Sequence, residues 1–171
     1  MRVAIIGAGV VGALASWRLA RDGHEVTVFE QYRLDHDRGS SFGDSRIVRR
    51  VYADPFYTEL MAEGYDLWDE LQSAVPQTEL FFRAGGLFFG PKGHSDVQAA
   101  RRALADSGVE HEVLDPADTR RRYPAVGLQP GEIALYEPGM GYARASNVVQ
   151  AAAELARNCG ASIREERKLV A

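Results

Sequence analysis

The chain has 171 residues with a net charge of −4, and 46% of its residues are hydrophobic. This length and composition suit one ordinary domain or parts of two, and the acidic balance argues against a nucleic-acid partner. The single cysteine, Cys159, excludes an internal disulfide and a cysteine-based metal cluster, and it fits a cytoplasmic location. No apolar run is long enough to span a bilayer, and the histidines lack metal-ligand spacing, so we expect neither a membrane anchor nor a metal site.

The first thirty residues have the pattern of a strand, a helix and a second strand. The segment VAIIGA (3–8) is apolar on both alternations, which is typical of a parallel strand buried on both faces. Residues 10–21 carry apolar side chains at helical spacing, and Gly23 follows as a helix end. A second strand, EVTVFE (25–30), leads into a polar loop at 31–44.

The middle of the chain alternates helices with strands of a more antiparallel character. TELMAEGYDLWDELQSAV (58–75) is an amphipathic helix because its apolar residues recur every three or four positions. The next predicted elements are a strand with a glycine pair at 81–91, a helix at 95–108 that begins at Ser95 or Asp96, a strand at 109–115, and a short helix at 116–124 capped by Asp115. Antiparallel strands follow at 131–138 and 139–145 around a Pro-Gly turn. The last predicted elements are a helix at 146–162 capped by Ser146 and a final strand at 162–171.

These elements predict an α/β protein in which one domain interrupts another. Residues 1–75 and 145–171 have the alternating strands and helices of a Rossmann-type core with a parallel sheet. Residues 76–144 have the pattern of part of a mixed, antiparallel α+β domain, which we expect to hold substrate.

Three glycines lie where the first strand meets the first helix. Gly7, Gly9 and Gly12 match G-x-G-x-x-G, in which the glycines allow a tight turn, close approach to a pyrophosphate and close packing of the helix on the sheet. Glu30 ends the second strand, where a carboxylate accepts hydrogen bonds from ribose hydroxyls. The sequence therefore predicts a dinucleotide site, to which we also assign Val10, Val11 and Gln31.

Two simpler interpretations of this region stay open. The glycines could form an α/β turn that holds no ligand, and Glu30 could be an ordinary charge at the end of a strand. If a dinucleotide binds, the Glu30 carboxylate disfavours the 2′-phosphate of NADP but does not separate NAD from FAD.

A cluster of arginines follows the predicted ribose-binding strand. Arg46, Arg49 and Arg50 lie in the segment GSSFGDSRIVRRVY (39–52), and Arg38 precedes it. In an acidic protein, cations concentrated near a phosphate site suggest that they bind an anion, whereas the alternative is a solvated basic loop.

The same segment carries a family resemblance. GAGVVG with Glu30, GSSFGDSRIVRRVY, GGLFFGPKG and YEPGMGYARASNVVQAAAELARNCGASI together resemble the monomeric sarcosine oxidase and N-methyltryptophan oxidase family. This family belongs to the D-amino-acid oxidase superfamily of FAD-dependent oxidoreductases. The resemblance implies a Rossmann-type FAD-binding core interrupted by part of a substrate domain, with FAD as the cofactor.

The resemblance also implies roles for individual residues. Gly7, Gly9 and Gly12 would bind the FAD pyrophosphate, and Leu169 or its neighbour would lie on the strand that touches the adenine ring. The flavin would be contacted by a loop containing Ser40, Gly43, Asp44 and Ser45. Arg46 matches an arginine close to the flavin ring, and Arg49 matches the arginine that binds the substrate carboxylate.

The implied reaction is the oxidation of an amine. A secondary or N-methyl amino acid would be oxidised at its C–N bond to an imine, and O2 would be reduced to H2O2. Phe42 departs from the family, which often has histidine at this position, so the polarity beside the flavin should differ.

The resemblance covers this chain from end to end but only the N-terminal part of the family pattern. We therefore expect a fragment that needs a C-terminal half or a partner subunit and is inactive alone. Two alternatives remain, a non-catalytic nucleotide-binding subunit and an NAD-dependent dehydrogenase. In an NAD-dependent dehydrogenase, the arginine segment would have no obvious function.

Overall fold

The structure, a computed structural model, describes residues 1–34 and 36–170; Asp35 in the predicted polar loop and Ala171 in the predicted final strand lie outside the described part. The chain divides into two compact units, of which the first comprises Met1–Arg46, Leu71–Leu80 and Ala143–Ala171 and the second Ile47–Glu70 and Phe81–Tyr142. This division assigns residues 47–70 to the second unit, whereas the predicted nucleotide-binding core includes them. The functional domain boundaries stay a prediction.

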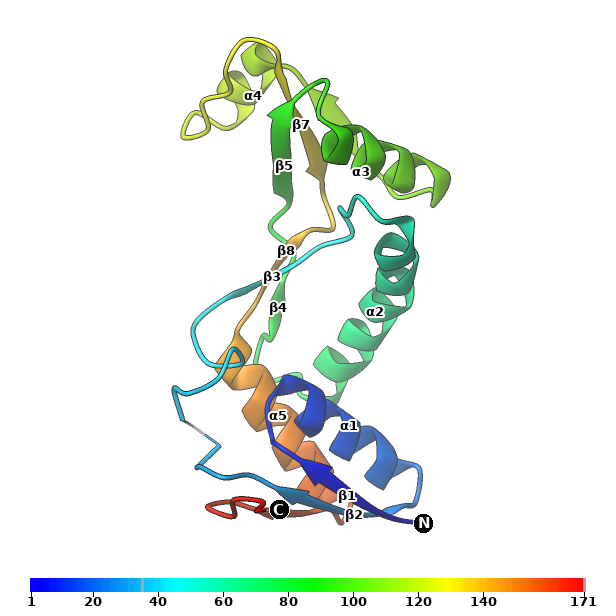
Figure 1. The fold of residues 1–171 in the computed structure, drawn as a ribbon, viewed down its shortest axis with the longest axis vertical. Helices are drawn as coiled ribbons and strands as arrows, with labels where there is room; N and C mark the ends of the chain where they lie inside the picture. Colours follow the sequence, from blue (N-terminus) through cyan, green and yellow to red (C-terminus); the bar gives the residue numbers. More distant parts are fainter. Residues whose placement is uncertain (35, 171) are drawn as a thin grey trace. The chain divides into compact units, whose positions relative to one another are not determined.

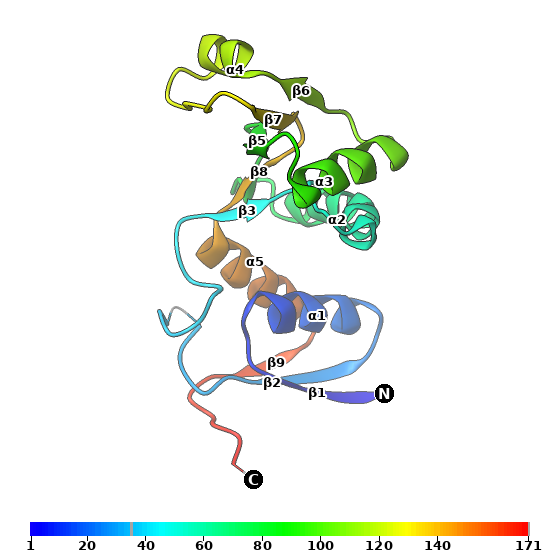
Figure 2. The ribbon, with the colours of Figure 1, turned by 45° about the horizontal axis from the view of Figure 1, so that its top comes forward.

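A parallel sheet and two helices make up most of the first unit. The strands β1 (Arg2–Ile6), β2 (Glu25–Phe29) and β9 (Ser162–Arg164) lie in the order β1–β2–β9. The helices α1 (Val10–Arg21) and α5 (Ala145–Asn158) pack against each other on one face of this sheet, as Figure 1 and Figure 2 show. The predicted α/β fold with a parallel sheet is confirmed.

The core of the first unit lies between the sheet and these helices. Val26 and Val28 of β2 are buried, and Ala13 of α1 forms a buried cluster with Val149 and Ala152 of α5. Small side chains at this position let the two helices approach closely, which brings the start of each helix to the same end of the sheet.

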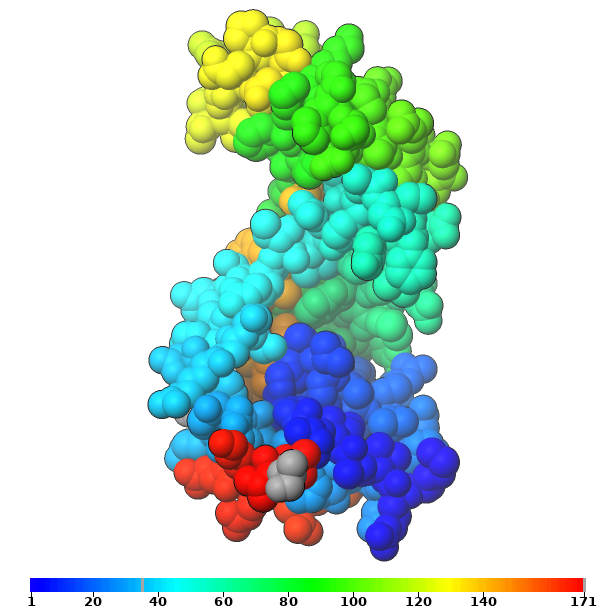
Figure 3. Space-filling model, viewed as in Figure 1, coloured from blue at the N-terminus to red at the C-terminus, as the bar shows by residue number. Residues whose placement is uncertain are grey.

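The edge strand β1 is less buried than its sequence predicts. Val3 and Ile5 are partly buried, whereas Ala4 and Ile6 on the opposite face are exposed, Ile6 to 56%. The expectation of burial on both faces is wrong for the described residues, because α1 and α5 cover one face and β1 pairs only with β2. Figure 3 shows this N-terminal segment, in dark blue, at the surface.

The second unit combines helices with short strands. Its elements are β3 (Arg46–Val48), α2 (Pro55–Ala74, whose last turn belongs to the first unit), β4 (Phe81–Phe82), β5 (Gly86–Pro91), α3 (Ser95–Asp106), β6 (Glu112–Leu114), α4 (Pro116–Arg122), β7 (Glu132–Glu137) and β8 (Gly141–Ala143). The strands β5, β7 and β6 form an antiparallel sheet in that order. The mixed, antiparallel character predicted for this part of the chain is confirmed.

The predicted hairpin at 131–145 is wrong. Its second strand, β8, does not pair with β7 but lies between β3 and β4 in a separate sheet. The Pro-Gly turn ends β7 and redirects the chain, and the partners of β8 come from residues far away in the sequence.

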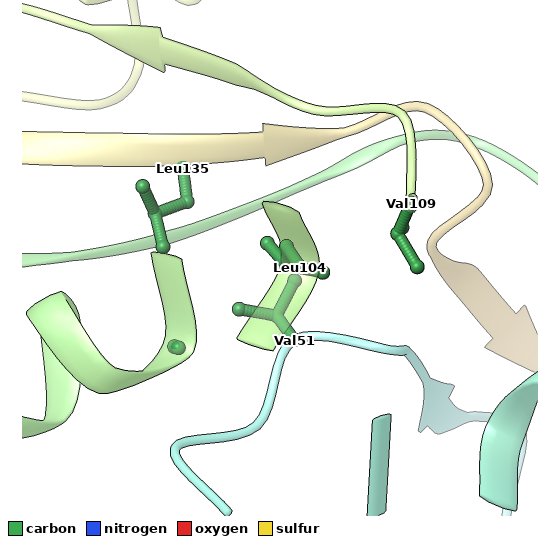
Figure 4. Close-up of a cluster of buried hydrophobic side chains, with 5 residues drawn as sticks. Val51, Leu104, Val109 and Leu135 are labelled. Carbon is green, nitrogen blue, oxygen red and sulfur yellow. The ribbon is translucent and has the colours of Figure 1, made fainter. Parts of the chain in front are cut away.

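A buried cluster of aliphatic side chains stabilises the second unit. Figure 4 shows Val51, Leu104, Val109 and Leu135, which come from four separate segments, and Phe88 of β5 packs against the same cluster. Because Val51 directly follows the arginine segment, this cluster anchors that segment to the antiparallel sheet.

Several predicted element ends also differ. The arginine segment contains an unexpected strand, β3, and the final strand ends at Arg164 rather than at residue 171. Helix α3 is capped by His94, whose Nδ1 accepts from Asp96 N, rather than by Ser95 or Asp96. Asp115 caps α4 as predicted. None of the helices in the described part is long and apolar enough to cross a bilayer.

Candidate functional site

The turn between β1 and α1 is shaped by two of the predicted glycines. Gly7 has a φ of +89°, a left-handed conformation that L side chains rarely adopt, and its N–H donates to the Phe29 carbonyl at 2.8 Å. A Cβ on Gly12 would lie 2.0 Å from the Gly7 carbonyl oxygen. The turn therefore requires glycine at both positions, for conformation at Gly7 and for close approach at Gly12.

Glu30 is a buried carboxylate beside this turn. It is 5% exposed, and its two oxygens accept hydrogen bonds from Ala8 N at 2.8 Å and from Tyr32 N at 2.9 Å. His36 Nε2 lies 3.6 Å from one of these oxygens. Each carboxylate oxygen can accept more than one hydrogen bond, so Glu30 retains capacity for ribose hydroxyls.

The N-terminus of α1 is contacted by a serine that the sequence interpretation missed. Ser41 Oγ accepts from Val10 N at 3.0 Å, and a Cβ on Gly9 would lie 3.2 Å from the same oxygen. The absence of a side chain at Gly9 thus leaves room for Ser41. Val11, also predicted to bind the cofactor, is 79% exposed on the first turn of the helix.

The segment 39–46 folds back on itself and onto α5. Gly43 N donates to Ser146 Oγ at 3.0 Å, so the serine predicted to cap α5 instead holds this loop from within the first turn of the helix. Arg46 donates to the carbonyl oxygens of Ser40, Phe42 and Ser45. The side chains of Ser40, Asp44 and Ser45 are exposed.

A cavity of about 300 Å³ lies between the turn, the end of β2 and this loop. Four of the predicted site residues line it: Gly9, Glu30, Gln31 and Ser40. The other lining residues are Ala8, Tyr32, Leu34, His36, Arg38, Gly39, Ser41, Phe42, Ser146 and Val149. A pocket of this size holds part of a dinucleotide, and the glycine turn with its buried carboxylate fits the adenosine diphosphate end.

Part of the cavity wall is aromatic and basic. The Tyr32 ring meets the His36 ring edge-on with centroids 5.0 Å apart, and the Arg38 guanidinium lies 4.9 Å from the Tyr32 ring centroid. The prediction of a polar loop did not identify Tyr32 or His36 as site residues. Their position two and six residues after Glu30 is the only signal in the sequence, because the loop must pass the end of β2.

Leu169 is not among the residues that line this cavity. It lies beyond β9 and is 65% exposed. The chain just before it runs beside the cavity wall, since Glu166 N donates to the Tyr32 carbonyl at 3.0 Å and Arg167 N to the Glu30 carbonyl at 2.8 Å. Contact of Leu169 with adenine stays a prediction.

The second unit holds the remaining predicted residue, Arg49. Its guanidinium lies 4.9 Å from the Tyr52 ring centroid and 5.8 Å from that of Phe88, and Tyr52 in turn packs near Tyr57. The side chain is partly buried, and these contacts hold its planar head between aromatic faces. Such a head presents paired N–H donors that suit a carboxylate.

Its neighbour Arg50 has a different environment. Arg50 Nε donates to Glu137 Oε1 at 2.7 Å, and Arg50 N donates to the other oxygen of the same carboxylate at 3.0 Å. Glu137 is fully buried, so this arginine is a structural partner and not a free anion-binding group. Arg38, Arg46, Arg49 and Arg50 therefore each have different contacts.

The chain is similar to oxidoreductases of known function. A family model described as "FAD dependent oxidoreductase" matches residues 2–171. The peroxisomal sarcosine oxidase of Homo sapiens is 32% identical over 166 residues, which cover 97% of this chain and 42% of that protein. The monomeric sarcosine oxidase of Streptomyces avermitilis is 34% identical over 168 residues, which cover 98% of this chain and 44% of that protein.

A solved structure with the same arrangement is NikD, an unusual amino acid oxidase essential for nikkomycin biosynthesis. It matches with a TM-score of 0.81 and 26% identity, over 95% of this chain and 42% of that one. The chain therefore spans less than half the length of these relatives.

Proposed function

This chain belongs to the family of FAD-dependent oxidoreductases, and we propose that it forms the FAD-binding part of an amine oxidase of the sarcosine oxidase type. The observation that carries the proposal is the buried Glu30 carboxylate hydrogen-bonded to Ala8 N at the glycine turn. This contact places an acceptor for ribose hydroxyls beside the amino end of a helix, the arrangement that a dinucleotide requires.

The residues of the first unit have distinct tasks in this proposal. The turn at Gly7, Gly9 and Gly12 admits the diphosphate, and the positive amino end of α1 at Val10 and Val11 attracts its negative charge, although Val10 N already donates to Ser41 Oγ. Glu30 accepts the ribose hydroxyls next to Gln31. The exposed side chains of Ser40, Asp44 and Ser45 and the backbone at Gly43 would contact the flavin, and the charge of Arg46 would favour electron density there.

FAD bound in this way supplies the redox chemistry, in which an amine C–N bond is oxidised to an imine and O2 is reduced to H2O2. Arg49 binds the carboxylate of an amino-acid substrate through its paired N–H donors. The aromatic rings of Tyr52 and Phe88 keep this guanidinium in one orientation. The substrate is a secondary or N-methyl amino acid.

Visible absorption tests the cofactor assignment. The purified protein incubated with FAD and then desalted should retain a yellow flavin spectrum, and Glu30→Gln should weaken FAD binding because the amide cannot accept from both N–H groups. Binding of NADH without any affinity for FAD would contradict the proposal and support the NAD-dependent alternative.

Steady-state kinetics of the complete oxidase test Arg49. Arg49→Ala should raise KM for an N-methyl amino acid by about tenfold or more, because a charge-assisted bidentate contact is lost. An amine substrate that lacks a carboxylate serves as the control and should keep its KM. Equal effects on both substrates would show that Arg49 has another role.

We also propose that the rest of the relatives' length is supplied by further chain or by a partner subunit. The support is the partial span of the matches together with the free edge and exposed face of β1. If the chain is instead a non-catalytic subunit, it should bind FAD but show no oxidase activity, either alone or together with the remaining polypeptide. A cytoplasmic location fits the single cysteine, and cell fractionation tests it.

A further inference from the structure

Arg46 makes an unusual set of contacts for a residue expected to face a cofactor. Its Nε donates to the Ser40 carbonyl at 2.8 Å, and its two terminal nitrogens donate to the carbonyls of Ser45 and Phe42, each at 2.6 Å. All three acceptors are main-chain oxygens of the loop that precedes it. The guanidinium thus lies inside a turn of its own backbone.

The geometry of the loop matches this guanidinium closely. Gly43 has a φ of +118°, and a Cβ there would lie 3.3 Å from the nearer terminal nitrogen. A side chain at this position would crowd the arginine head, so the glycine lets the backbone curve around it. Three of the five N–H donors of Arg46 are used in this way.

Contacts with α1 and α5 hold the same loop from outside, and they include a hydrogen bond from Ser146 N to the Gly43 carbonyl at 3.3 Å. Ser41 Oγ accepts from Val10 N at the start of α1, and Ser146 Oγ of α5 accepts from Gly43 N. These contacts position the loop against the two helices. Within the loop, Phe42 N donates to the Gly39 carbonyl at 3.2 Å, and the three bonds of Arg46 draw the carbonyls of three residues to one planar group.

We infer that Arg46 is a positioning residue that shapes the 40–45 backbone before any cofactor arrives. This role goes beyond a charge near the flavin, although its consequence for cofactor affinity rests on the proposed function. The two roles make opposite predictions for lysine. Lysine keeps the positive charge but cannot reach three carbonyls from a single ammonium group.

The test uses the chain itself and the variants Arg46→Lys and Arg46→Gln. Chymotrypsin cleavage after Phe42, whose side chain is 46% exposed, reports the order of the loop. We expect both variants to be cleaved about tenfold faster than the unaltered chain, because the loop opens when its charge-assisted hydrogen bonds are lost. FAD affinity, measured by quenching of flavin fluorescence, should fall to a similar extent in both.

Matched controls are Arg21→Lys and Arg21→Gln at the last residue of α1, which make the same chemical changes away from the loop. They should leave cleavage after Phe42 unchanged. If Arg46→Lys behaves like the unaltered protein in both measurements, charge alone matters and the inference is overturned. If both Arg46 variants are cleaved faster while FAD affinity stays the same, the positioning role holds and the proposed flavin contact of the loop is wrong.

Discussion

At the residue scale, the glycine turn depends on steric room at Gly12 as well as on the backbone conformation of Gly7. A Cβ on Gly12 would lie 2.0 Å from the Gly7 carbonyl, a distance that no small adjustment relieves, because both groups belong to the backbone. Alanine is otherwise the better residue inside a helix. Gly12 therefore weakens α1, but it allows the helix to contact the turn that follows β1.

Substitution of this glycine should separate crowding from helix propensity. We expect Gly12→Ala to lower the free energy of unfolding by about 1–3 kcal/mol, as overpacking does, and to abolish FAD retention. The matched control is Gly64→Ala in α2, where the new Cβ would meet only the flexible end of Met61 at 3.3 Å. That variant should gain about 0.5–1 kcal/mol, and thermal denaturation measures both. A stable Gly12→Ala protein would contradict the close approach.

Tyr65 links the stability of the second unit to alkaline pH. Burial, and then the neighbouring Glu137 carboxylate, raise the pKa of the Tyr65 phenol well above its usual value of about 10. Its hydroxyl donates to the Gly139 carbonyl at 3.0 Å. Because the folded pKa is raised, the contribution of Tyr65 to stability is complete below pH ~10 and is lost as pH rises beyond it.

Tyr65→Phe tests this linkage. The variant loses one hydrogen bond, about 1 kcal/mol at neutral pH, but its free energy of unfolding should fall less steeply above pH 10. Urea denaturation between pH 8 and pH 11 compares the two proteins. If the free energy of unfolding falls equally steeply above pH 10 in both proteins, groups other than Tyr65 cause the loss of stability at alkaline pH.

At the element scale, a buried ion pair joins the arginine segment to β7. Glu137 is fully buried and accepts from both the side chain and the main chain of Arg50, which immediately precedes the core residue Val51. The pair thus holds the segment between β3 and Val51 against the end of β7. Removal of one partner leaves the other without its hydrogen bonds in a poorly solvated place.

Glu137→Gln should therefore lower the free energy of unfolding by about 3 kcal/mol. The matched control is Asp69→Asn, which alters the ion pair with Arg83 in the same unit, where Asp69 is 60% exposed. We expect that change to cost less than ~1 kcal/mol. Similar losses in the two variants, measured by denaturant titration, would argue against a special role for the buried pair.

At the scale of the whole molecule, one face of the first sheet is exposed at β1 in the described part of the chain. Ile6 is 56% exposed on the face opposite α1 and α5, and β1 has an open edge. Apolar side chains on both faces are typical of parallel strands that are covered twice. The relatives are more than twice as long as this chain, so they have the residues with which to cover this face.

Ile6→Lys should reveal whether this face is covered in the complete oxidase. In the chain alone, the change should alter the free energy of unfolding by no more than ~0.5 kcal/mol, because the side chain is already solvated. With the remaining polypeptide present, in cis or as a subunit, the variant should lose flavin and oxidase activity. If Ile6→Lys is tolerated equally well in the chain alone and in the presence of the remaining polypeptide, the remaining polypeptide does not cover this face.

The chain alone should produce no H2O2 from N-methyl amino acids, because the proposed active site requires the remaining polypeptide. A peroxidase-coupled assay of the chain, with and without that polypeptide, measures this directly. Steady peroxide production by the chain alone would contradict the expectation that it is an incomplete oxidase.

The sequence by itself determined the local features: the glycine turn, the helices predicted at 10–21 and 95–108, and the alternation that predicts an α/β fold. The family match also confirms FAD as the predicted cofactor. These predictions succeed because each depends on neighbouring residues, through backbone conformation or through the spacing of apolar side chains.

Only the tertiary structure decided which distant groups meet. Glu30 bonds Ala8 across 22 residues, Ser146 holds Gly43 across 103, and β8 pairs with β3 and β4 instead of the adjacent β7. Arg46 donates hydrogen bonds to residues that are close to it in the sequence. The sequence nevertheless did not predict these hydrogen bonds, because they depend on how the loop curves. Hydrogen-bond partners and strand neighbours are chosen by how the whole chain packs, and no short segment contains that information.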